Sequence, residues 1–490
     1  MINKEISWSN LKAVSITLLL CAAASVPDQA QTFKTLVDFD GTNGAHPERM
    51  SPVQGRDANL YGTTSAGGYT PMCIQGCGTV FRVSRTGKLI VIYNFYQQPG
   101  DPIDPAPGLT LATNGGFYGT TVSGGPANAG VVFEVISGGQ MATLYNFCTL
   151  PNCADGSDAY GQLTEGLDGN FYGTTSGFGY AVPGTIFRMT PTGDLTTLYT
   201  FPSSGRPTGK LVLATDGNFY GTNFGNGSDC ALYSCGTIFR VTPSGVLTTM
   251  HTFAGLDGSE PWAGIVQASD GNFYGTTVFG GAAAGGTVFK MTPGGKFQTI
   301  YSFCGRNNCS DGYLPYAPLA QATDGNLYGV TADGGDTSCT YGCGTVFKIT
   351  LQGELTTLHS FTGNDGMHPE GGLLQSTNGI LYGATLGGGD LTCTDPLGPG
   401  CGTIFSLDMG LGPFITFVRA AGKVGQTGGI LGQGFTGTTD VSLNGVPANF
   451  TVVSDTYINA TVPAGATTGY VTVTTPTGVL TSNVPFHVLK

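Results

Sequence analysis

Charged residues are scarce in this sequence. Only 10% of its 490 residues are charged, and 19 Lys and Arg against 31 Asp and Glu give a formal net charge of −12. Binding to nucleic acid or to an anionic membrane requires a concentrated positive surface, and an acidic chain with few, scattered basic residues lacks one. The composition therefore predicts no nucleic-acid partner.

Long hydrophobic runs are also rare. The one pronounced run, residues 13–24 (AVSITLLLCAAA), is too short to span a bilayer, which takes about twenty residues. It follows Lys4 and Lys12, and small residues near Ala23 offer a cleavage site. This pattern predicts a signal peptide over residues 1–25 and a secreted protein, extracellular, at the cell surface or periplasmic, with no membrane span after cleavage. Lipidation at Cys21 is the less favoured alternative, because large leucines precede it.

The sequence contains none of the common catalytic motifs. The sequence has no nucleophile elbow, phosphate-binding loop or calcium loop, and none of its five His residues pairs with another at metal-ligand spacing. His251 and His359 stand where other copies of an internal repeat have Tyr, which predicts structural positions in strands. These absences favour a protein that is not an enzyme and needs no cofactor.

The cysteines favour an oxidising compartment. Apart from Cys21, the twelve remaining cysteines fall into close pairs. Zinc would need four ligands at one point, so six short disulfides are the better interpretation. The predicted bonds are Cys73–Cys77, Cys148–Cys153, Cys230–Cys235, Cys304–Cys309, Cys339–Cys343 and Cys393–Cys401.

An internal repeat dominates the sequence. A Tyr-Gly pair recurs seven times at spacings of 57, 54, 48, 54, 54 and 54 residues, in phrases such as DGNFYGTT. A GTVF or GTIF phrase, a short turn and a phrase such as LTTLYTF follow it. The Tyr residues are Tyr61, Tyr118, Tyr172, Tyr220, Tyr274, Tyr328 and Tyr382.

Each repeat has the pattern of four antiparallel strands. Apolar and polar residues alternate with a period of two, and the Asp-Gly-Asn and Pro-Thr-Gly phrases suit tight turns. Four strands in about 54 residues correspond to one blade of a β-propeller. We therefore expect an all-β fold with a seven-bladed β-propeller over residues 33–407.

The ends of the repeat region predict how this propeller closes. The last repeat lacks its LTTLYTF strand, and an orphan copy, FKTLVDF, begins at Phe33. We expect this N-terminal strand to complete the last blade. The variable loops and all six cysteine pairs would then lie on one face, and the short turns on the other.

The C-terminal stretch follows a different pattern. Short alternating strands over about 78 residues without cysteine predict a small β-sandwich at residues 412–490. This stretch resembles the IPT/TIG group of immunoglobulin-like domains, which implies a spacer or a binding module. The resemblance rests on Pro413, Ile415, Gly432, Phe435, Val441, Val446, Ala448, Val462, Pro463, Gly469, Val471 and Phe486.

The repeat wording itself resembles a known group. GNFYGTT followed by GTIFRMTPTGDLTTLYTF is similar to the GloVer-type tandem repeats of bacterial exported proteins that use diverse cell-surface anchors. The similarity spans about residues 33–406 and implies no settled activity. The sequence ends at Lys490 without a sorting motif, which favours a soluble secreted form over an anchored one.

One variable position suggests a binding site. A proline recurs thirteen residues before the repeat Tyr, and the innermost strands that follow should line the central channel. Aromatic side chains near carboxylates suit sugar rings, with inter-blade packing as the alternative. The residues after this proline position are Glu48 (aligned with one insertion), Ala106, Tyr160, Thr208, Trp262, Tyr316 and Glu370. We expect Trp262, Tyr316, Tyr160, Glu370 and Glu48 to contact a ligand.

Two further sets of residues carry weaker hypotheses. His46 and His368 both lie in His-Pro-Glu phrases of neighbouring repeats, and with Glu48 and Glu370 they could form an acid–base pocket, although repeat similarity explains them as well. A second set of acids could hold calcium, although a simple turn role is favoured. These acids are Asp101, Asp155, Asp257, Asp311 and Asp365.

Two functions are open at this point. The favoured one is a secreted, non-catalytic binding or structural protein whose loop face recognises an extracellular glycan or protein. The alternative is an extracellular carbohydrate-active enzyme, a hydrolase or lyase, with acid and base carboxylates at the channel mouth.

Overall fold

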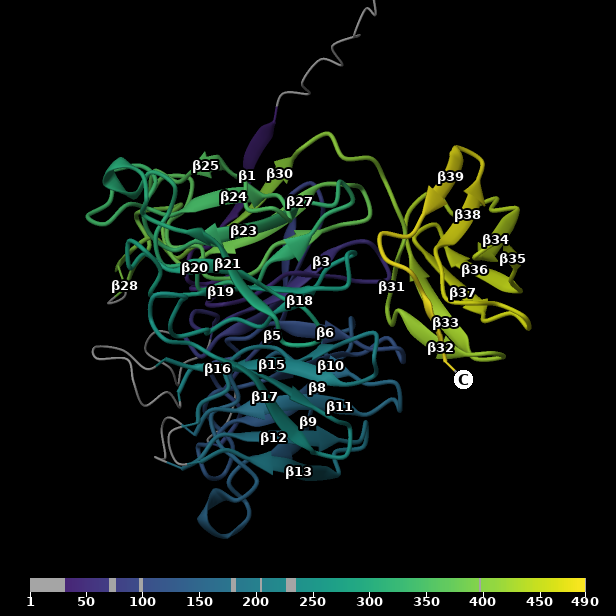
Figure 1. The fold of residues 1–490 in the computed structure, drawn as a ribbon, viewed down its shortest axis with the longest axis horizontal. Helices are drawn as coiled ribbons and strands as arrows, with labels where there is room; N and C mark the ends of the chain where they lie inside the picture. Colours follow the sequence, from purple (N-terminus) through teal and green to yellow (C-terminus); the bar gives the residue numbers. More distant parts are fainter. Residues whose placement is uncertain are drawn as a thin grey trace, which may run out of the picture.

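The repeat region folds into seven four-stranded antiparallel sheets (Figure 1). The computed structural model describes residues 31–69, 76–96, 100–177, 182–202, 205–225, 235–395 and 398–489. The predicted signal peptide lies outside these residues. Within them the chain is all-β apart from two short 3₁₀ turns, Pro151–Cys153 and Asn307–Cys309. No helix in these ranges is long and apolar enough to cross a membrane.

The first six sheets are each formed by consecutive strands. The first two are β2 (Val53–Gln54), β3 (Leu60–Thr64), β4 (Thr79–Val83), β5 (Leu89–Asn94), and β6 (Leu109–Leu111), β7 (Phe117–Thr120), β8 (Val131–Val135), β9 (Met141–Asn146). The next two are β10 (Thr164–Glu165), β11 (Phe171–Thr175), β12 (Thr185–Met189), β13 (Leu195–Thr200), and β14 (Val212–Leu213), β15 (Phe219–Asn223), β16 (Thr237–Val241), β17 (Leu247–Thr252). The fifth and sixth are β18 (Val266–Gln267), β19 (Phe273–Thr277), β20 (Thr287–Met291), β21 (Phe297–Ser302), and β22 (Ala320–Gln321), β23 (Leu327–Thr331), β24 (Thr345–Ile349), β25 (Leu355–Ser360).

The seventh sheet joins the two ends of the repeat region. Its order is β1-β30-β27-β26, and β1 pairs antiparallel with β30, with Thr32 opposite Asp408. The predicted pairing of the N-terminal strand with the last repeat is thus confirmed. The strands are β26 (Leu374–Gln375), β27 (Leu381–Thr385), β30 (Thr403–Asp408) and β1 (Thr32–Asp38), and a small hairpin, β28 (Thr394–Asp395) and β29 (Gly398–Pro399), lies between β27 and β30.

The repeat Tyr and Gly anchor each sheet to the core. All seven Tyr side chains are among the largest fully buried groups. The Tyr274 hydroxyl donates to Asp270 in the preceding turn, at 2.8 Å. Gly follows Tyr because the sheet leaves no room for a side chain: a Cβ on Gly173 would lie 2.5 Å from the ring of Phe187. The repeated Tyr-Gly pair is therefore a packing requirement.

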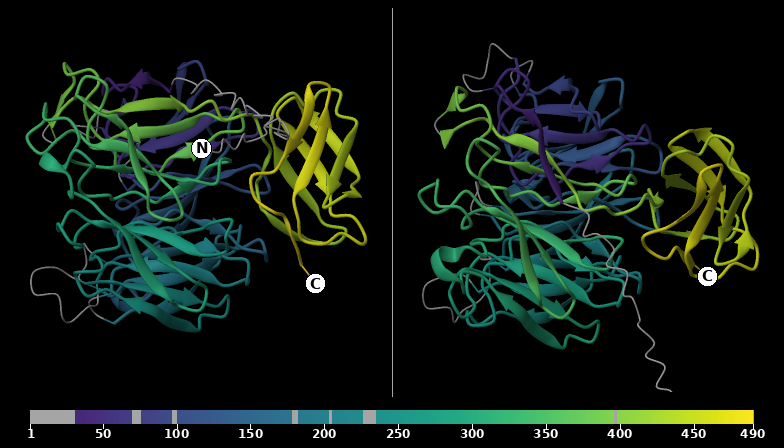
Figure 2. Two further views of the ribbon diagram at one scale, coloured as in Figure 1. Left: turned by 45° about the horizontal axis from the view of Figure 1, so that its top comes forward. Right: turned by 90° about the horizontal axis from the view of Figure 1, so that it is seen from above.

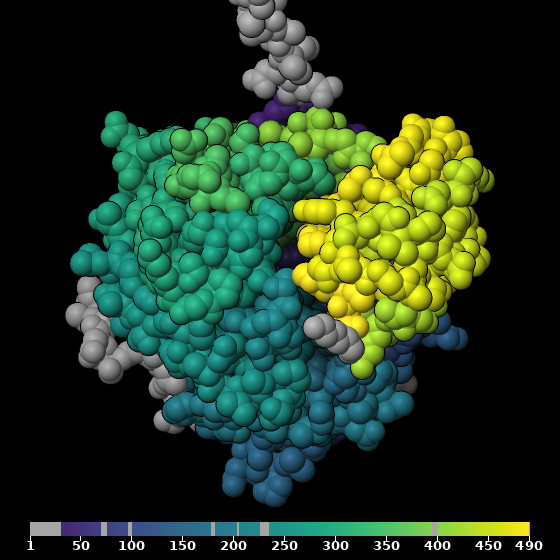
Figure 3. Space-filling view, turned by 45° about the vertical axis from the view of Figure 1, so that its right-hand side comes forward, coloured from purple at the N-terminus to yellow at the C-terminus, as the bar shows by residue number. Residues whose placement is uncertain are grey.

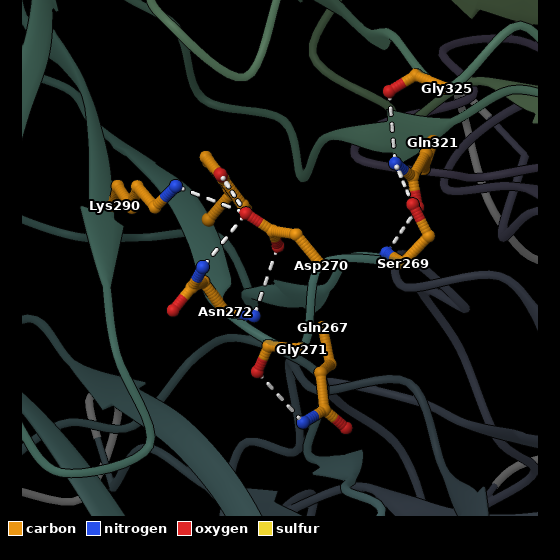
Figure 4. A network of polar contacts seen from close by, with 9 residues as sticks. Gln267, Ser269, Asp270, Gly271, Asn272, Lys290, Gln321 and Gly325 are labelled. Carbon is orange, nitrogen blue, oxygen red and sulfur yellow. Dashed lines mark hydrogen bonds and ion pairs between the residues drawn. The ribbon is translucent and has the colours of Figure 1, made fainter.

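Polar side chains connect neighbouring sheets (Figure 4). The Gln321 carboxamide accepts the Ser269 N–H of the preceding sheet at 2.7 Å and donates to the Gly325 carbonyl of its own sheet. Corresponding backbone N–H bonds join Thr113 to Glu165, Thr215 to Gln267, Thr323 to Gln375, and Thr377 to Gln54.

The contacts between sheets return to their starting point. The bond from Thr377 to Gln54 joins the seventh sheet to the first. A bridge between Ser51 and Gly108 joins the first to the second, and the Thr164 hydroxyl donates to the Leu211 carbonyl between the third and fourth. The seven sheets therefore form a closed circuit of contacts.

The antiparallel order gives this circuit two ends. We call the end with the connections between sheets, and between the second and third strands of each sheet, the loop face. The end with the connections between first and second and between third and fourth strands is the turn face. The disulfides Cys148–Cys153, Cys304–Cys309, Cys339–Cys343 and Cys393–Cys401 confirm four predicted pairs, all on the loop face. Cys77 and Cys235 are also disulfide-bonded, and their predicted partners Cys73 and Cys230 lie outside the described residues.

The C-terminal region forms two further four-stranded sheets around its own apolar core. Figures 1 and 2 show it in yellow against one side of the repeat sheets. One sheet is β31 (Thr416–Phe417), β33 (Thr427–Leu431), β37 (Tyr457–Thr461) and β36 (Phe450–Ser454), and the other is β35 (Val446–Pro447), β34 (Asp440–Leu443), β38 (Val471–Thr475) and β39 (Gly478–Thr481). A parallel pair, β32 (Ala421–Lys423) and β40 (His487–Leu489), completes the unit.

This C-terminal domain is docked on the turn face. The Arg56 guanidinium lies over the Tyr457 ring at 4.5 Å, and Arg85 donates to Gln433 at 2.8 Å. Both arginines lie in short turns of the first sheet. Tyr457 also belongs to one apolar cluster with Leu109 and Leu111 of the second sheet. The two domains therefore share a packed, partly polar interface.

Candidate functional site

A small pocket lies where the seven repeats converge near the loop face. Its volume is about 50 Å³, which is room for a few water molecules. Every repeat contributes to its wall through the segment that precedes its innermost strand. The lining includes Arg49, Pro107, Tyr160, Thr208, Lys210, Trp262, Tyr316 and Glu370. We call this space the axial pocket.

Most of the residues singled out at the proline position meet there. Tyr160, Trp262, Tyr316 and Glu370 line the axial pocket. Trp262 packs on Phe224 at 4.4 Å between ring centroids and meets Tyr316 edge-on at 6.3 Å. These aromatic side chains thus serve inter-sheet packing and form the pocket wall at once.

The first repeat departs from the expected alignment. The wall residue is Arg49, and Glu48 is not part of the lining. The extra residue after Pro47 moves the next side chain along the chain into the pocket. Glu48 instead pairs with Arg49 at 3.8 Å. Ala106, the corresponding residue of the second repeat, is buried.

Arg49 is the central charge of the pocket. Its guanidinium lies 4.4 Å from the Trp262 ring centroid and 5.4 Å from that of Tyr160. It also approaches Glu370 at 4.0 Å. Its Nε is buried without a hydrogen-bond partner among the described residues. A cation held by aromatic faces and two long ion pairs retains unused hydrogen-bonding capacity for a ligand.

Two carboxyl groups near Arg49 have raised pKa values. Burial raises the pKa of Glu370 to about 7, with Arg49 opposing and Glu48 reinforcing the shift. Burial, together with the charge of Glu48, also raises the pKa of Asp104 to about 7. One carboxyl oxygen of Asp104 is buried without a hydrogen-bond partner in the described part of the chain. Each group can therefore hold or release a proton near neutral pH.

The residue before the proline position is strained in most repeats. Its backbone lies in the left-handed region, which costs a side-chain-bearing residue about 1 kcal/mol. Such strain concentrates at ligand sites. The residues are His46, Asp104, Asp158, Glu260, Leu314 and His368, with φ between 52° and 60°.

The two histidines do not join the axial pocket. His46 is buried, and its Nδ1 lies 2.9 Å from the Leu386 carbonyl oxygen. His368 pairs with Asp333 at 2.9 Å, and this hydrogen bond raises the pKa of His368. Neither ring lines the space beside Glu370. The axial pocket therefore includes Glu370 but neither histidine nor Glu48, although His368 lies near enough to Glu370 for the charge of each group to affect the pKa of the other.

The second set of acids caps outer loops. Asp155 and Asp311 accept the hydroxyls of Tyr145 and Tyr301, each at 2.8 Å. Asp257 accepts the Ala254 N–H. Asp365 likewise accepts the Thr362 N–H. Asp257 and Asp365 each also form a hydrogen bond with a His ring of the same repeat. Asp101 lies near Tyr93. Within the described ranges no three His, Cys, Asp or Glu side chains gather in a metal-binding group.

Sequence reasoning missed Arg49, Asp104 and Lys210. A signal for Asp104 was available, since the residue before the proline position is polar or charged in six of seven repeats. Arg49 was hidden by the inserted residue. No signal in the sequence pointed to Lys210, because its place in the cavity walls depends on how the repeats converge in space.

Comparison with known proteins identifies the family to which the repeats belong. The family model of the Gloeobacter/Verrucomicrobia repeat matches residues 24–231 and 206–449, so the chain belongs to this family. No curated protein sequence matches the chain. The finer resemblances to anchored proteins and to IPT/TIG domains remain expectations.

The chain is similar to several solved structures at low sequence identity. A fungal alcohol oxidase of the AA5 family, solved in complex with copper, is 14% identical with a TM-score of 0.52, covering 94% of this chain and 99% of its own. A putative gluconolactonase is 10% identical with a TM-score of 0.39, covering 79% and 94%. A luciferin-regenerating enzyme is 11% identical with a TM-score of 0.39, covering 62% and 92%. The first likeness extends over both domains and concerns the fold alone.

Proposed function

We propose that this protein is an exported glycan-binding protein whose axial pocket receives one polar group of the ligand. In this proposal the seven sheets are the blades of a β-propeller, and the C-terminal domain is an immunoglobulin-like module of the IPT/TIG type. The closed circuit of sheet contacts and the two C-terminal sheets support this architecture. The disulfides and the apolar run at residues 13–24 support export to an oxidising compartment.

The observation that carries the proposal is the convergence of aromatic and charged side chains in one pocket. Trp262 and Tyr316 offer apolar faces, and Arg49 and Glu370 offer a donor and an acceptor. Sugars combine C–H faces with hydroxyls and match such a surface. The pocket volume of about 50 Å³ suits a hydroxymethyl or carboxylate substituent, so the rest of the glycan would lie on the loop face.

The experiment is a binding screen of the purified protein against a polysaccharide panel, with calcium or with chelator. We expect Trp262→Ala to weaken binding at least tenfold, because the ring forms the pocket wall. Tyr341→Ala, at an exposed aromatic residue on the loop face, is the matched control and should leave affinity unchanged. Binding insensitive to Trp262→Ala, or no binding to any glycan, would reject the proposal.

A second candidate function is acid–base catalysis on a glycan. The favouring observation is the raised pKa, about 7, of both Asp104 and Glu370, which have Arg49 and Glu48 as common electrostatic neighbours. Reducing-end release measured in the same screen separates the candidates. Release that Glu370→Gln abolishes while binding persists would establish the enzyme, and binding without release would exclude it for those glycans.

A further inference from the structure

A much larger cavity lies at the opposite end of the repeats. It occupies about 760 Å³ between the turn face and the C-terminal domain, and Figure 3 shows a hollow where the yellow domain meets the teal sheets. Ligand sites of this size are common at domain interfaces. The second to fifth sheets and the segments 418–421 and 484–489 supply its wall. We call it the interdomain cavity.

The repeat changes its chemistry at this cavity. Seven residues before each repeat Tyr, five sheets have Gln or Glu, which accepts a backbone N–H of the preceding sheet. The second and fourth sheets have Leu111 and Leu213 instead, and both line the cavity. Each Leu gives up an inter-sheet hydrogen bond that its neighbours make. The substitution turns the wall apolar where Val266, Val418 and Leu489 also line it.

One positive charge in this wall has no partner. Lys210 makes no hydrogen bond or ion pair with any described residue, and it lines both the interdomain cavity and the axial pocket. Burial lowers its pKa to about 8, so it remains mostly protonated at neutral pH. A half-buried ammonium group without a counter-charge is costly and favours an anion beside it.

The other charges of the wall are balanced. Arg419 pairs with Glu165 at 3.8 Å, and Glu165 also accepts the Thr113 N–H. Burial opposes the ionisation of Asp216, but hydrogen bonds from Asn218 and Tyr220 and the charge of Arg240 outweigh it and lower the pKa of Asp216. Burial lowers the pKa of His487. Among the described residues of the wall, Lys210 is therefore the charged group without a neighbour of opposite charge.

From these observations we infer that the interdomain cavity binds an anionic amphiphile, an aliphatic chain ending in a carboxylate. The chain would contact Leu111, Leu213 and Val266, and the carboxylate would accept a hydrogen bond from the Lys210 ammonium. This site shares Lys210 with the wall of the axial pocket, but the inference does not depend on the proposed glycan binding.

The test measures binding of dodecanoate, below its micellar concentration, by calorimetry on the full protein. Lys210→Gln should weaken binding about tenfold or more, because it removes the cation. Lys296→Gln, which removes an exposed cation elsewhere on the turn face, should have no effect. Dodecyltrimethylammonium, with the same tail and the opposite charge, should bind at least tenfold more weakly than dodecanoate.

Leu213→Gln tests the apolar wall without endangering the fold. It restores the residue found in neighbouring repeats, whose acceptor role it can resume, and it should weaken dodecanoate binding severalfold. Trp262→Ala should not affect dodecanoate, which distinguishes this site from the axial pocket. Failure of dodecanoate to bind, equal binding to the Lys210→Gln variant, or loss of binding on Trp262→Ala would each overturn the inference.

Discussion

The loop face and the turn face are built from the same repeat, yet they differ in almost every respect. The turn face consists of short turns in which an Asp binds the repeat Tyr and the adjacent Asn, as Asp270 binds Tyr274 and Asn272. The loop face has connections of variable length, disulfides and left-handed backbone positions. Hydrogen bonds that recur in the repeats determine the structure of the turn face. Residues that differ between repeats determine the structure of the loop face.

The comparison distinguishes groups that stabilise the fold from groups that, in the proposed function, would contact a ligand. Groups that recur in all seven sheets, such as the repeat Tyr, are buried and fully bonded. Groups that do not recur in every repeat, such as Arg49 and Asp104, leave polar atoms unpaired among the described residues. Unpaired polar atoms cost stability and are retained where a ligand can satisfy them. The predictions below test this division, beginning with the largest effect.

Tyr274→Ala should strongly destabilise the protein. The side chain is fully buried and its hydroxyl is bonded to Asp270, so its removal leaves a cavity and should cost about 3–5 kcal/mol of unfolding free energy. Chemical unfolding followed by fluorescence measures the loss. Tyr341→Ala, at a residue 75% exposed, should cost almost nothing. Equal costs at the two positions would contradict the assignment of stability to the repeated groups.

Glu370→Gln should stabilise the protein at alkaline pH. Burial raises the pKa of Glu370 from 4.5 to about 7, so ionisation opposes folding. The carboxyl is neutral in both states below pH 4.5, and the cost grows as pH rises to about 7 and is then constant. The variant should gain about 1–3 kcal/mol relative to wild type at pH 8 and little at pH 4. Thermal unfolding at both pH values measures this, and a gain independent of pH would show that the pocket imposes no ionisation cost.

Gln321→Leu should have the smallest effect. The change removes the acceptor of the Ser269 N–H and imitates the Leu found at position 213, so we expect a loss of about 1 kcal/mol. Gln298→Leu, at an exposed strand residue, is the control for added apolar surface. If Gln321→Leu is neutral or stabilising in chemical unfolding, the inter-sheet bonds are not what holds neighbouring sheets in register.

Much of the fold could be predicted because the same pattern of strands and turns occurs seven times in the sequence. Alternating apolar residues and Asp-Gly-Asn turns are local signals, and repetition averages out the exceptions. The position of the N-terminal strand that begins near Phe33 could be predicted, because only the last repeat lacked the corresponding strand. The described disulfides followed from sequence proximity, since Cys304 and Cys309 have few other partners within reach.

The candidate site could be predicted only in part. Trp262 and Tyr316 were identified because they vary at a fixed position of the repeat. In the first repeat the alignment predicted Glu48 as the pocket residue, but the residue that lines the pocket is Arg49, because one inserted residue shifts which side chain faces it. His368 was grouped with Glu370, and it does lie near enough for its charge to act on Glu370, but it pairs with Asp333 and is not part of the pocket lining.

By itself the sequence determined the all-β class, the number of repeat sheets, the strand that joins the ends and the described disulfides, because all of these depend on local periodicity and short-range spacing. Only the tertiary structure decided the axial pocket around Arg49 and the interdomain cavity beside Lys210. Those sites form where residues from repeats far apart in the chain converge. The burial that shifts the pKa of Glu370 and Lys210 arises from that convergence, which no single repeat encodes.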